Sequence, residues 1–164
     1  MIKIKEITDS TELKNSLKII RKSFATVAAE QNLTRQKVPG HSAFLTWDKL
    51  LELQKKATLF GLFLDGTQVG FVGVEKADTD GSIYYMDKLA VLPEYRHKGY
   101  GRELVNFAVE YVKKQGGSKV SLGMIDSQTV LKQWYISLGF KEMGTKKFEH
   151  LPFIVRFMDR IISS

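Results

Sequence analysis

The stretch "YYMDKLAVLPEYRHKGYGRELVNFAVEYVKKQG" at residues 84–116 decides the fold, because a strand pattern, a basic glycine loop and a helical pattern follow one another in it. A glycine turn before the first turn of a helix leaves backbone N–H groups without intrahelical partners, at the positive end of the helix dipole. Gly99 and Gly101 also let the backbone approach phosphate oxygens closely, so the loop is predicted to bind an anion. The basic side chains that add charge at its rim are Arg96, His97, Lys98 and Arg102.

The loop differs from two common phosphate-binding loops. Leu104 stands where the dinucleotide fingerprint needs its third glycine, and the sequence has no Gly-Lys-Ser or Gly-Lys-Thr of a nucleoside-triphosphate loop. Tyr100 lies between the two glycines and is expected either to pack against the protein or to flank the ligand. Taken alone, the pattern also fits an ordinary helix start, so the segments around the loop are needed to interpret it.

The chain before this stretch predicts two helices followed by a strand meander. Apolar residues recur every three or four positions after Asp9, which forms a helix cap with Glu12 as its reciprocal partner. Thr46 caps a second, shorter helix after the break at Pro39. Turn signals then separate three apolar runs, which predict antiparallel strands at residues 58–64, 68–77 and 82–92.

The chain after the loop predicts a helix, a strand, a second helix and two closing strands. Gly116 and Gly117 end the first helix, and Gly139 ends the second. A strand, helix, strand crossover makes the two central strands parallel, whereas the meander and the tail are antiparallel. The apolar run "LPFIVRFM" fits either a core strand or a strand at a subunit interface. The predicted segments are a strand at 119–125, a helix at 128–138 and strands at 140–150 and 151–158.

Length and composition predict one soluble domain that spans residues 1–164. The chain has no cysteine, which excludes disulfides, thiolate metal sites and a cysteine nucleophile, and fits a reducing compartment such as the cytoplasm. The formal net charge of +7 favours an anionic partner and disfavours cationic polyamines. The basic residues are scattered, which argues against nucleic acid, and the N-terminus lacks the apolar stretch of a signal peptide or membrane span.

Two motifs in a fixed order give the chain a family resemblance. The first is the strand ending "LAV" followed by Arg-x-x-Gly-x-Gly at residues 96–101, and the second is "WYISLGF" at residues 134–140. With these motifs the chain resembles the GNAT superfamily of acyl-CoA-dependent N-acyltransferases, in its small bacterial type. The resemblance implies an α/β acyl-CoA N-acyltransferase fold: a single N-acetyltransferase domain with a mixed central sheet of about six or seven strands flanked by helices.

The resemblance also implies where the cosubstrate acetyl-CoA lies. Backbone amides of residues 96–102 would hold the pyrophosphate, and the backbone of residues 89–91 would pair with the pantetheine arm as an additional strand. An amide near the end of this strand would polarise the thioester carbonyl. Many family members have Asn where this chain has Gln128, which changes the placement of contacts to the cofactor arm. The implied cofactor-binding residues are Leu89, Ala90, Val91, Arg96, His97, Lys98, Gly99, Tyr100, Gly101, Arg102, Ser127 and Gln128.

For catalysis, Tyr135 aligns with the family tyrosine that faces the sulfur and can protonate the departing thiolate, and simple helix packing is its alternative role. The amine must lose a proton, because an alkyl amine with a pKa near 10.4 is neutral in only about one molecule in 2,500 at pH 7. Asp87, on the strand that leads to the thioester, is the first candidate base, and Glu75 is the second. A water chain without a single base is the alternative. His41 is a weaker candidate on the presumed acceptor side, and the histidine spacing matches no metal site.

The function that the resemblance implies is direct transfer of an acetyl group from acetyl-CoA to a primary amine of a small molecule or peptide. Two other functions stay open at this point. One is a non-catalytic acyl-CoA-binding or sensing module, which could dispense with Tyr135. The other is an acetyltransferase that acts on protein lysines or N-termini. Pairing into a homodimer through the sheet edge or the tail is also found in the family.

Overall fold

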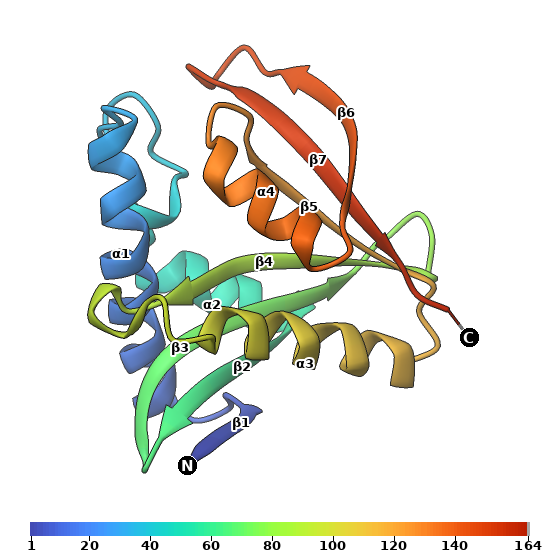
Figure 1. Cartoon of the computed structure of the whole chain (residues 1–164). Helices are drawn as coiled ribbons and strands as arrows, with labels where there is room; N and C mark the ends of the chain where they lie inside the picture. Colours follow the sequence, from blue (N-terminus) through green and yellow to red (C-terminus); the bar gives the residue numbers. More distant parts are fainter. Residues whose placement is uncertain (164) are drawn as a thin grey trace.

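The computed structural model describes residues 1–163, which form an α/β arrangement of one sheet and four α-helices (Figure 1). The sheet has seven strands in the order β1-β2-β3-β4-β5-β7-β6. The strands are β1 (Ile2–Glu6), β2 (Ala57–Leu64), β3 (Thr67–Lys76), β4 (Ile83–Val91), β5 (Lys119–Ile125), β6 (Lys141–Lys147) and β7 (Ile154–Ile161). The helices are α1 (Ser10–Glu30), α2 (Trp47–Lys56), α3 (Tyr100–Lys114) and α4 (Thr129–Ser137), with short 3-10 turns η1 (Ser42–Phe44) and η2 (Pro93–Tyr95).

The sheet consists of two antiparallel halves, β1 to β4 on one side and β5, β7 and β6 on the other. The parallel strands β4 and β5 join the halves, and α3 is the crossover between them. The predicted meander, the parallel central pair and the size of the sheet are confirmed. Strand β7 lies between β5 and β6, and its Met158 is fully buried, so "LPFIVRFM" contributes to a core strand.

Strand β1 was not predicted from the sequence. It pairs antiparallel with β2 at the edge of the sheet, from Ile2 opposite Leu64 to Glu6 opposite Phe60. Most of its side chains are exposed, including that of Ile2 at 42 %. Residues 2–5 alternate isoleucine and lysine, which is the period-two pattern of a half-buried strand, so the sequence does contain a local signal for β1.

The two N-terminal helices begin at the predicted caps, with one difference. The Asp9 carboxylate accepts a hydrogen bond from the Glu12 N–H at 2.8 Å, and Thr46 Oγ1 accepts one from the Lys49 N–H at 3.3 Å. We expected the Glu12 carboxylate to return a hydrogen bond to Asp9. It instead pairs with Lys5 Nζ at 2.6 Å, which ties the start of α1 to the edge strand β1.

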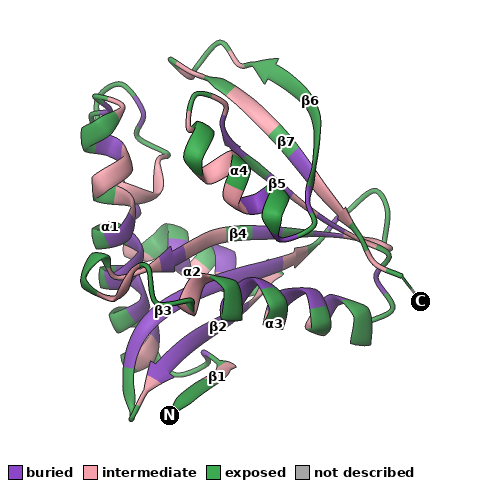
Figure 2. Cartoon of the chain, in the orientation of Figure 1, coloured by how far each residue is buried: buried purple, intermediate pink, exposed green. Residues whose placement is uncertain are grey.

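Helices cover both faces of the sheet, and the buried apolar side chains form clusters on opposite sides of it. Helices α1 and α2 pack on one face, where Leu59, Phe71 and Ala90 are buried. Helices α3 and α4 pack on the other face, where Val72 and Met86 are buried together with apolar side chains of β5 and β7. Consecutive residues along β3, such as Phe71 and Val72, therefore point to opposite faces of the sheet and to different pairs of helices. Strand β6 is exposed along its length (Figure 2).

A third, smaller cluster holds the segment between α1 and α2 against the other half of the sheet. Leu33 and Val38 of this segment pack with Ala28 of α1 and with Ile125 at the end of β5. The segment that we call the α1–α2 segment, residues 31–46, is thereby fixed beside the ends of the central strands. This segment contains His41, which is predicted from the sequence to lie on the acceptor side.

Candidate active site

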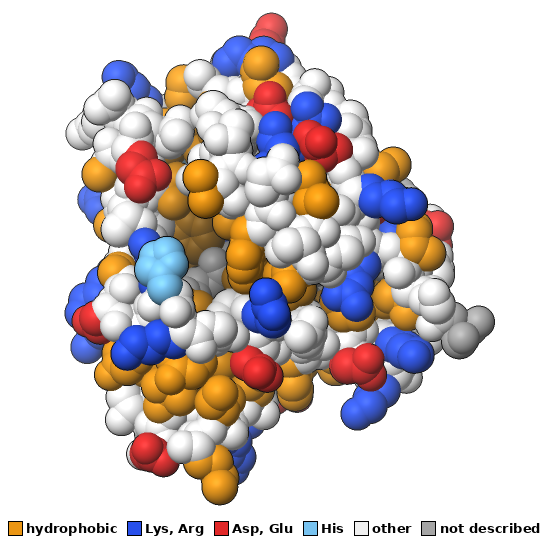
Figure 3. Space-filling model, viewed as in Figure 1, with side chains coloured by type: hydrophobic (Ala, Val, Ile, Leu, Met, Phe, Trp, Pro, Cys, Tyr) orange, Lys and Arg blue, Asp and Glu red, His pale blue; other side chains and the backbone are white. Residues whose placement is uncertain are grey.

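Strands β4 and β5 separate after a short parallel contact. Backbone pairing begins between Ile83 and Lys119 and ends between Tyr85 and Ser121, and Figure 1 shows the strands diverging beyond it. Figure 3 shows a hollow with hydrophobic side chains between α1, α4 and the loop before α3. The open edge of β4 can therefore take an extended ligand as an additional strand. The predicted pantetheine-binding residues on this part of β4 are Leu89, Ala90 and Val91.

The loop between β4 and α3 presents a run of backbone N–H groups that the described chain does not use. The Arg96 N–H donates to the Pro93 carbonyl at 3.3 Å, and the first helical bond of α3 joins the Glu103 N–H to the Gly99 carbonyl at 3.1 Å. Between them, the N–H groups of residues 97–102 make no hydrogen bond within the described chain. Free N–H groups at a helix N-terminus have the geometry of an anion site.

The two loop glycines are there for different structural reasons. Gly99 has a left-handed backbone with φ +88°, and no atom lies within 4 Å of the position that a Cβ would take. A Cβ on Gly101 would lie 3.2 Å from Trp134 Cζ2, so this glycine gives room to an indole of α4. His97 also has a positive φ, 63°, which is uncommon outside glycine. Gly99 thus permits the turn, whereas Gly101 permits α3 and α4 to pack closely.

The basic side chains of the loop have different surroundings. The Arg96 guanidinium donates to the Ser23 carbonyl at 2.8 Å and to Thr26 Oγ1 at 3.1 Å, so it braces the loop against α1. This corrects the expectation that the Arg96 side chain adds charge at the rim. Tyr100 is half-buried and packs against the core. The exposed basic side chains of the loop are those of His97, Lys98 and Arg102.

Tyr135 lies in α4 with its ring in the core. The ring meets those of Trp134 and Phe140 edge-on, at centroid distances of 5.0 and 5.5 Å. The residue is 7 % exposed, and burial raises the pKa of its hydroxyl above the ordinary value. The hydroxyl makes no hydrogen bond within the described chain. It is therefore a protonated donor without a partner at neutral and alkaline pH.

The two candidate bases lie on the other face of the sheet from Tyr135. Glu75 and Asp87 are placed diagonally across the β3–β4 ladder. Their neighbours Val74 and Met86 belong to the core under α3 and α4, so both carboxylates point to the side of α1 and α2. Neither carboxylate makes an ion pair within residues 1–163. A protonated donor and two free carboxylates thus lie on opposite faces of the central strands.

A comparison with protein-family models identifies the family. The model described as the acetyltransferase (GNAT) family matches residues 24–140, more than half of the chain, and the match includes the loop before α3 and Tyr135. The chain belongs to the GNAT family of acetyltransferases. The resemblance drawn from the two sequence motifs is therefore confirmed.

Solved GNAT structures share the fold along the whole chain. The ribosomal-protein-S18-alanine N-acetyltransferase from Escherichia coli is 19 % identical, with a TM-score of 0.77 over 100 % of this chain and 96 % of its own. The PaiA N-acetyltransferase from Thermoplasma acidophilum, in complex with coenzyme A, is 21 % identical, with a TM-score of 0.75 over 99 % of each chain. A probable acetyltransferase from Staphylococcus epidermidis is 14 % identical, with a TM-score of 0.79 over 99 % of this chain and 100 % of its own. At these identities the likeness shows the acyl-CoA N-acyltransferase fold.

In this GNAT chain the turn before α4 holds the two remaining predicted cofactor contacts. Ser127 Oγ donates to Gln31 Oε1 at 3.3 Å, which links the turn to the end of α1. Gln128 occupies the N-cap position of α4, but its side chain makes no capping hydrogen bond. The Gln128 carboxamide is therefore open to a ligand, whereas the Ser127 hydroxyl is engaged.

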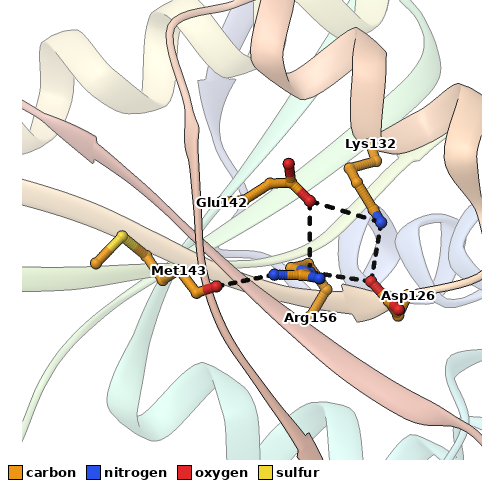
Figure 4. A network of polar contacts seen from close by, with 5 residues as sticks. All are labelled: Asp126, Lys132, Glu142, Met143 and Arg156. Carbon is orange, nitrogen blue, oxygen red and sulfur yellow. Dashed lines mark hydrogen bonds and ion pairs between the residues drawn. The ribbon is translucent and has the colours of Figure 1, made fainter.

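Sequence reasoning missed an ion-pair network beside α4 (Figure 4). Lys132 Nζ and Arg156 Nε each lie 2.9 Å from Asp126 Oδ1 and 3.6 Å from Glu142 Oε1. The hydrogen bonds from Lys132 and Arg156 lower the pKa of Asp126. The network links α4, which carries Tyr135, to β6 and β7. Because Asp126 and Arg156 are 30 positions apart, no local pattern could have revealed it.

Two further findings bear on metals and membranes. Within residues 1–163, no three His, Cys, Asp or Glu side chains gather closely enough to hold a metal ion. In the same part of the chain, no helix is both long and apolar enough to span a bilayer.

His41 lies at the start of η1, where its ring packs between those of Phe24 and Phe44.

Proposed function

We propose that this GNAT protein is an N-acetyltransferase that moves an acetyl group directly from acetyl-CoA to a primary amine of a small molecule or peptide. The observation that carries the proposal is the opening between β4 and β5 next to the free N–H groups of residues 97–102. An open strand edge for an amide-bearing arm and a nearby anion site for its phosphates suit coenzyme A. The chain has no cysteine that could carry the acetyl group, which favours direct transfer.

The backbone supplies most of the proposed cosubstrate binding. The N–H groups of residues 97–102 would hold the pyrophosphate, with the exposed basic side chains at the rim. The backbone of residues 89–91 would pair with the pantetheine arm, and the Gln128 carboxamide would contact the same arm. A backbone N–H of this strand would then polarise the thioester carbonyl, and such a preorganised donor contributes about 3 kcal/mol to transition-state stabilisation.

Tyr135 is the proposed general acid. The amine nitrogen bonds to the carbonyl carbon, the carbon–sulfur bond breaks, and the tyrosine hydroxyl donates its proton to the departing thiolate. Burial keeps the hydroxyl protonated, and its lack of a hydrogen-bond partner leaves it free to face the sulfur. Because the raised pKa makes Tyr135 a weak acid, its contribution is expected to be about 10²-fold or less.

Asp87 is the proposed acceptor of the amine proton, and Glu75 is the second candidate. Asp87 lies on β4 itself, two residues before Leu89, whereas Glu75 lies on the neighbouring strand. Both carboxylates are on the face opposite Tyr135. The amine proton would therefore leave on one side of the sheet, directly or through water, while the proton for sulfur arrives on the other.

The proposed partner is a free amine in the cytoplasm, not nucleic acid or a membrane. The lack of cysteine supports a reducing compartment, and the scattered basic residues support a small anionic cosubstrate rather than a nucleic-acid surface. This part of the proposal rests on composition alone.

The test measures release of coenzyme A from acetyl-CoA at mildly alkaline pH with pooled amines: amino acids, polyamines, aminoglycosides, arylamines, and lysine or N-terminal peptides. We expect release above the amine-free rate with at least one pool, and an acetylated amine in the mass spectrum. Binding of acetyl-CoA by calorimetry without release in any pool would instead indicate a sensor. Failure of the folded protein to bind acetyl-CoA would contradict the proposal.

A further inference from the structure

A β-bulge in β4 turns Lys88 to an unexpected side of the sheet. Strand residues normally alternate between faces, and Asp87 already points to the side of α1 and α2, so Lys88 would be expected on the side of α3 and α4. Lys88 instead has φ +55° at the register shift between β3 and β4, and its Nζ donates to Ser42 Oγ of η1 at 3.1 Å. The consecutive residues Asp87 and Lys88 therefore both point to the face of the sheet that α1 and α2 cover, and Lys88 reaches the α1–α2 segment there.

The Lys88 ammonium group has no anionic partner in the described chain. Its side chain is half-buried, and no carboxylate of residues 1–163 lies within the 4.0 Å of an ion pair. Ser42 accepts its hydrogen bond and keeps its own hydroxyl hydrogen free to donate. A half-buried ammonium group without a carboxylate partner is stabilised by a negative charge beside it, so this site favours a negatively charged ligand.

His41 adds a neutral donor at the same place. Its Nδ1 accepts a hydrogen bond from the Ala43 N–H at 3.1 Å, so the proton of the neutral ring is on Nε2. Burial and then the charge of Lys88 lower the pKa of His41, which keeps the ring neutral at neutral pH. The Nε2–H makes no hydrogen bond within the described chain. Phe24 and Phe44 lie 5.9 and 6.0 Å from the imidazole between ring centroids, and they fix its orientation.

We propose that the acceptor amine carries an acidic group, a carboxylate or a phosphonate, close to its nitrogen, as an amino acid does. Lys88, Ser42 and His41 hold the acidic group, while Asp87, the next residue along β4, takes the proton of the amine. The donors Lys88, Ser42 and His41 match the negative charge of a zwitterion, and the neighbouring Asp87 carboxylate matches its positive charge. The inference rests on the proposed N-acetyltransferase function and disfavours polyamines, whose additional charges are positive.

The test compares amino acids with their own carboxamides as acceptors, at equal concentrations of the neutral amine. The measured quantity is the ratio of kcat/KM for the acid to kcat/KM for the carboxamide, and we expect at least tenfold for the wild type. Lys88→Met is expected to lower this ratio at least tenfold through KM for the acid, and Lys88→Glu to invert it. Lys76→Met, which removes an exposed lysine at the end of β3, is the matched control and should leave the ratio unchanged.

Two readouts keep the inference separate from the proposed function and from folding. Equal efficiency with acids and carboxamides would overturn the zwitterionic acceptor and leave the N-acetyltransferase standing, whereas no coenzyme A release with any amine would contradict both. A lowered ratio accompanied by a raised KM for acetyl-CoA would mean that Lys88 only supports the bulge, and would also overturn the inference. Aminoalkylphosphonates, as a third set of acceptors, show which acid the site prefers.

Discussion

The loop before α3 and the α1–α2 segment lie on either side of the open end of β4, but they differ in what they offer a ligand. The loop offers backbone N–H groups, which depend on one left-handed glycine, Gly99, and on the start of a helix. The segment offers the side chains of His41 and Ser42, which become a site only where Lys88 of β4 meets them. Ligand binding by backbone groups should therefore tolerate many side-chain substitutions and be lost when the backbone conformation changes. Ligand binding by side chains should be lost when one of those side chains is substituted.

The Gly99→Glu variant is expected to have the largest effect, because it changes both the conformation and the charge of the backbone site. A residue with a Cβ in the left-handed conformation costs about 1–2 kcal/mol, and the carboxylate would lie at the proposed phosphate site. We expect the affinity for acetyl-CoA to fall by about 100-fold, equivalent to about 2.7 kcal/mol, by isothermal titration calorimetry.

A matched control for this variant is Gly144→Glu in β6. Gly144 also has no atom within 4 Å of its Cβ position, but it lacks a positive φ and lies away from the loop. The control should bind acetyl-CoA like the wild type. If Gly99→Glu also bound it normally, the loop would not be the phosphate site.

Tyr135→Phe is expected to have the next largest effect. It tests whether the Tyr135 hydroxyl acts as the general acid. Loss of the proposed acid should lower kcat by about 10- to 100-fold, while KM for acetyl-CoA stays the same because the ring still packs against Trp134 and Phe140. Since burial raises the pKa of Tyr135, the wild type should show no loss of rate from its ionisation up to about pH 10. An unchanged kcat in the variant would leave Tyr135 with a packing role alone.

Arg96→Ala tests whether the contact between the loop before α3 and helix α1 stabilises the fold. Removing a charged donor to Ser23 and Thr26 is expected to lower the free energy of unfolding by about 1.5–3 kcal/mol, measured with denaturant. Arg102→Ala, an exposed arginine of the same loop, is the control and should change the stability much less. Equal losses in the two variants would show that the brace from the loop to α1 does not stabilise the fold.

Asp126→Asn is expected to have the smallest effect, and to show it where the Asp126 carboxylate is charged, so that the variant and the wild type become alike at low pH. Lys132 and Arg156 lower the folded-state pKa of Asp126 below its ordinary value of 3.8, so its contribution to stability is complete above that value. The contribution is lost as the pH falls through the lowered pKa. Thermal unfolding between about pH 2 and 5 should therefore depend less steeply on pH in Asp126→Asn than in the wild type. Identical slopes would mean that the network does not stabilise the protein.

The fold could be predicted from the sequence because its signals are local. The caps at Asp9 and Thr46 and the helix-ending glycines Gly116 and Gly139 act within a few residues of themselves, and the structure confirms each of them. Strand β1 was not predicted, although its alternating isoleucines and lysines form the period-two pattern of a strand. The insertion of β7 between β5 and β6 depends on pairing at long range, which a single sequence does not encode locally.

In the candidate site, too, the local features could be predicted from the sequence and the long-range contacts could not. The free N–H groups before α3 follow from the glycine loop and the helix start, so a sequence is enough to predict them. The side-chain contacts are different: Arg96 reaches Ser23 at a separation of 73 positions, and Gly101 meets Trp134 of another helix. The turn of Lys88 toward Ser42 depends on a register shift between strands. Such features appear only when distant elements have packed together.

The short contact between β4 and β5 would make the proposed cosubstrate a structural part of the sheet. The two halves share only the pairs from Ile83–Lys119 to Tyr85–Ser121. Beyond Tyr85, β4 has no hydrogen bonds to β5 on this edge, and a bound pantetheine arm would provide them. Amide hydrogens of residues 86–91 on that edge would then exchange more slowly with solvent. By mass action, a ligand present at 100 times its Kd stabilises the folded state by about 2.7 kcal/mol. The resistance of this protein to unfolding would therefore rise and fall with the acyl-CoA concentration around it.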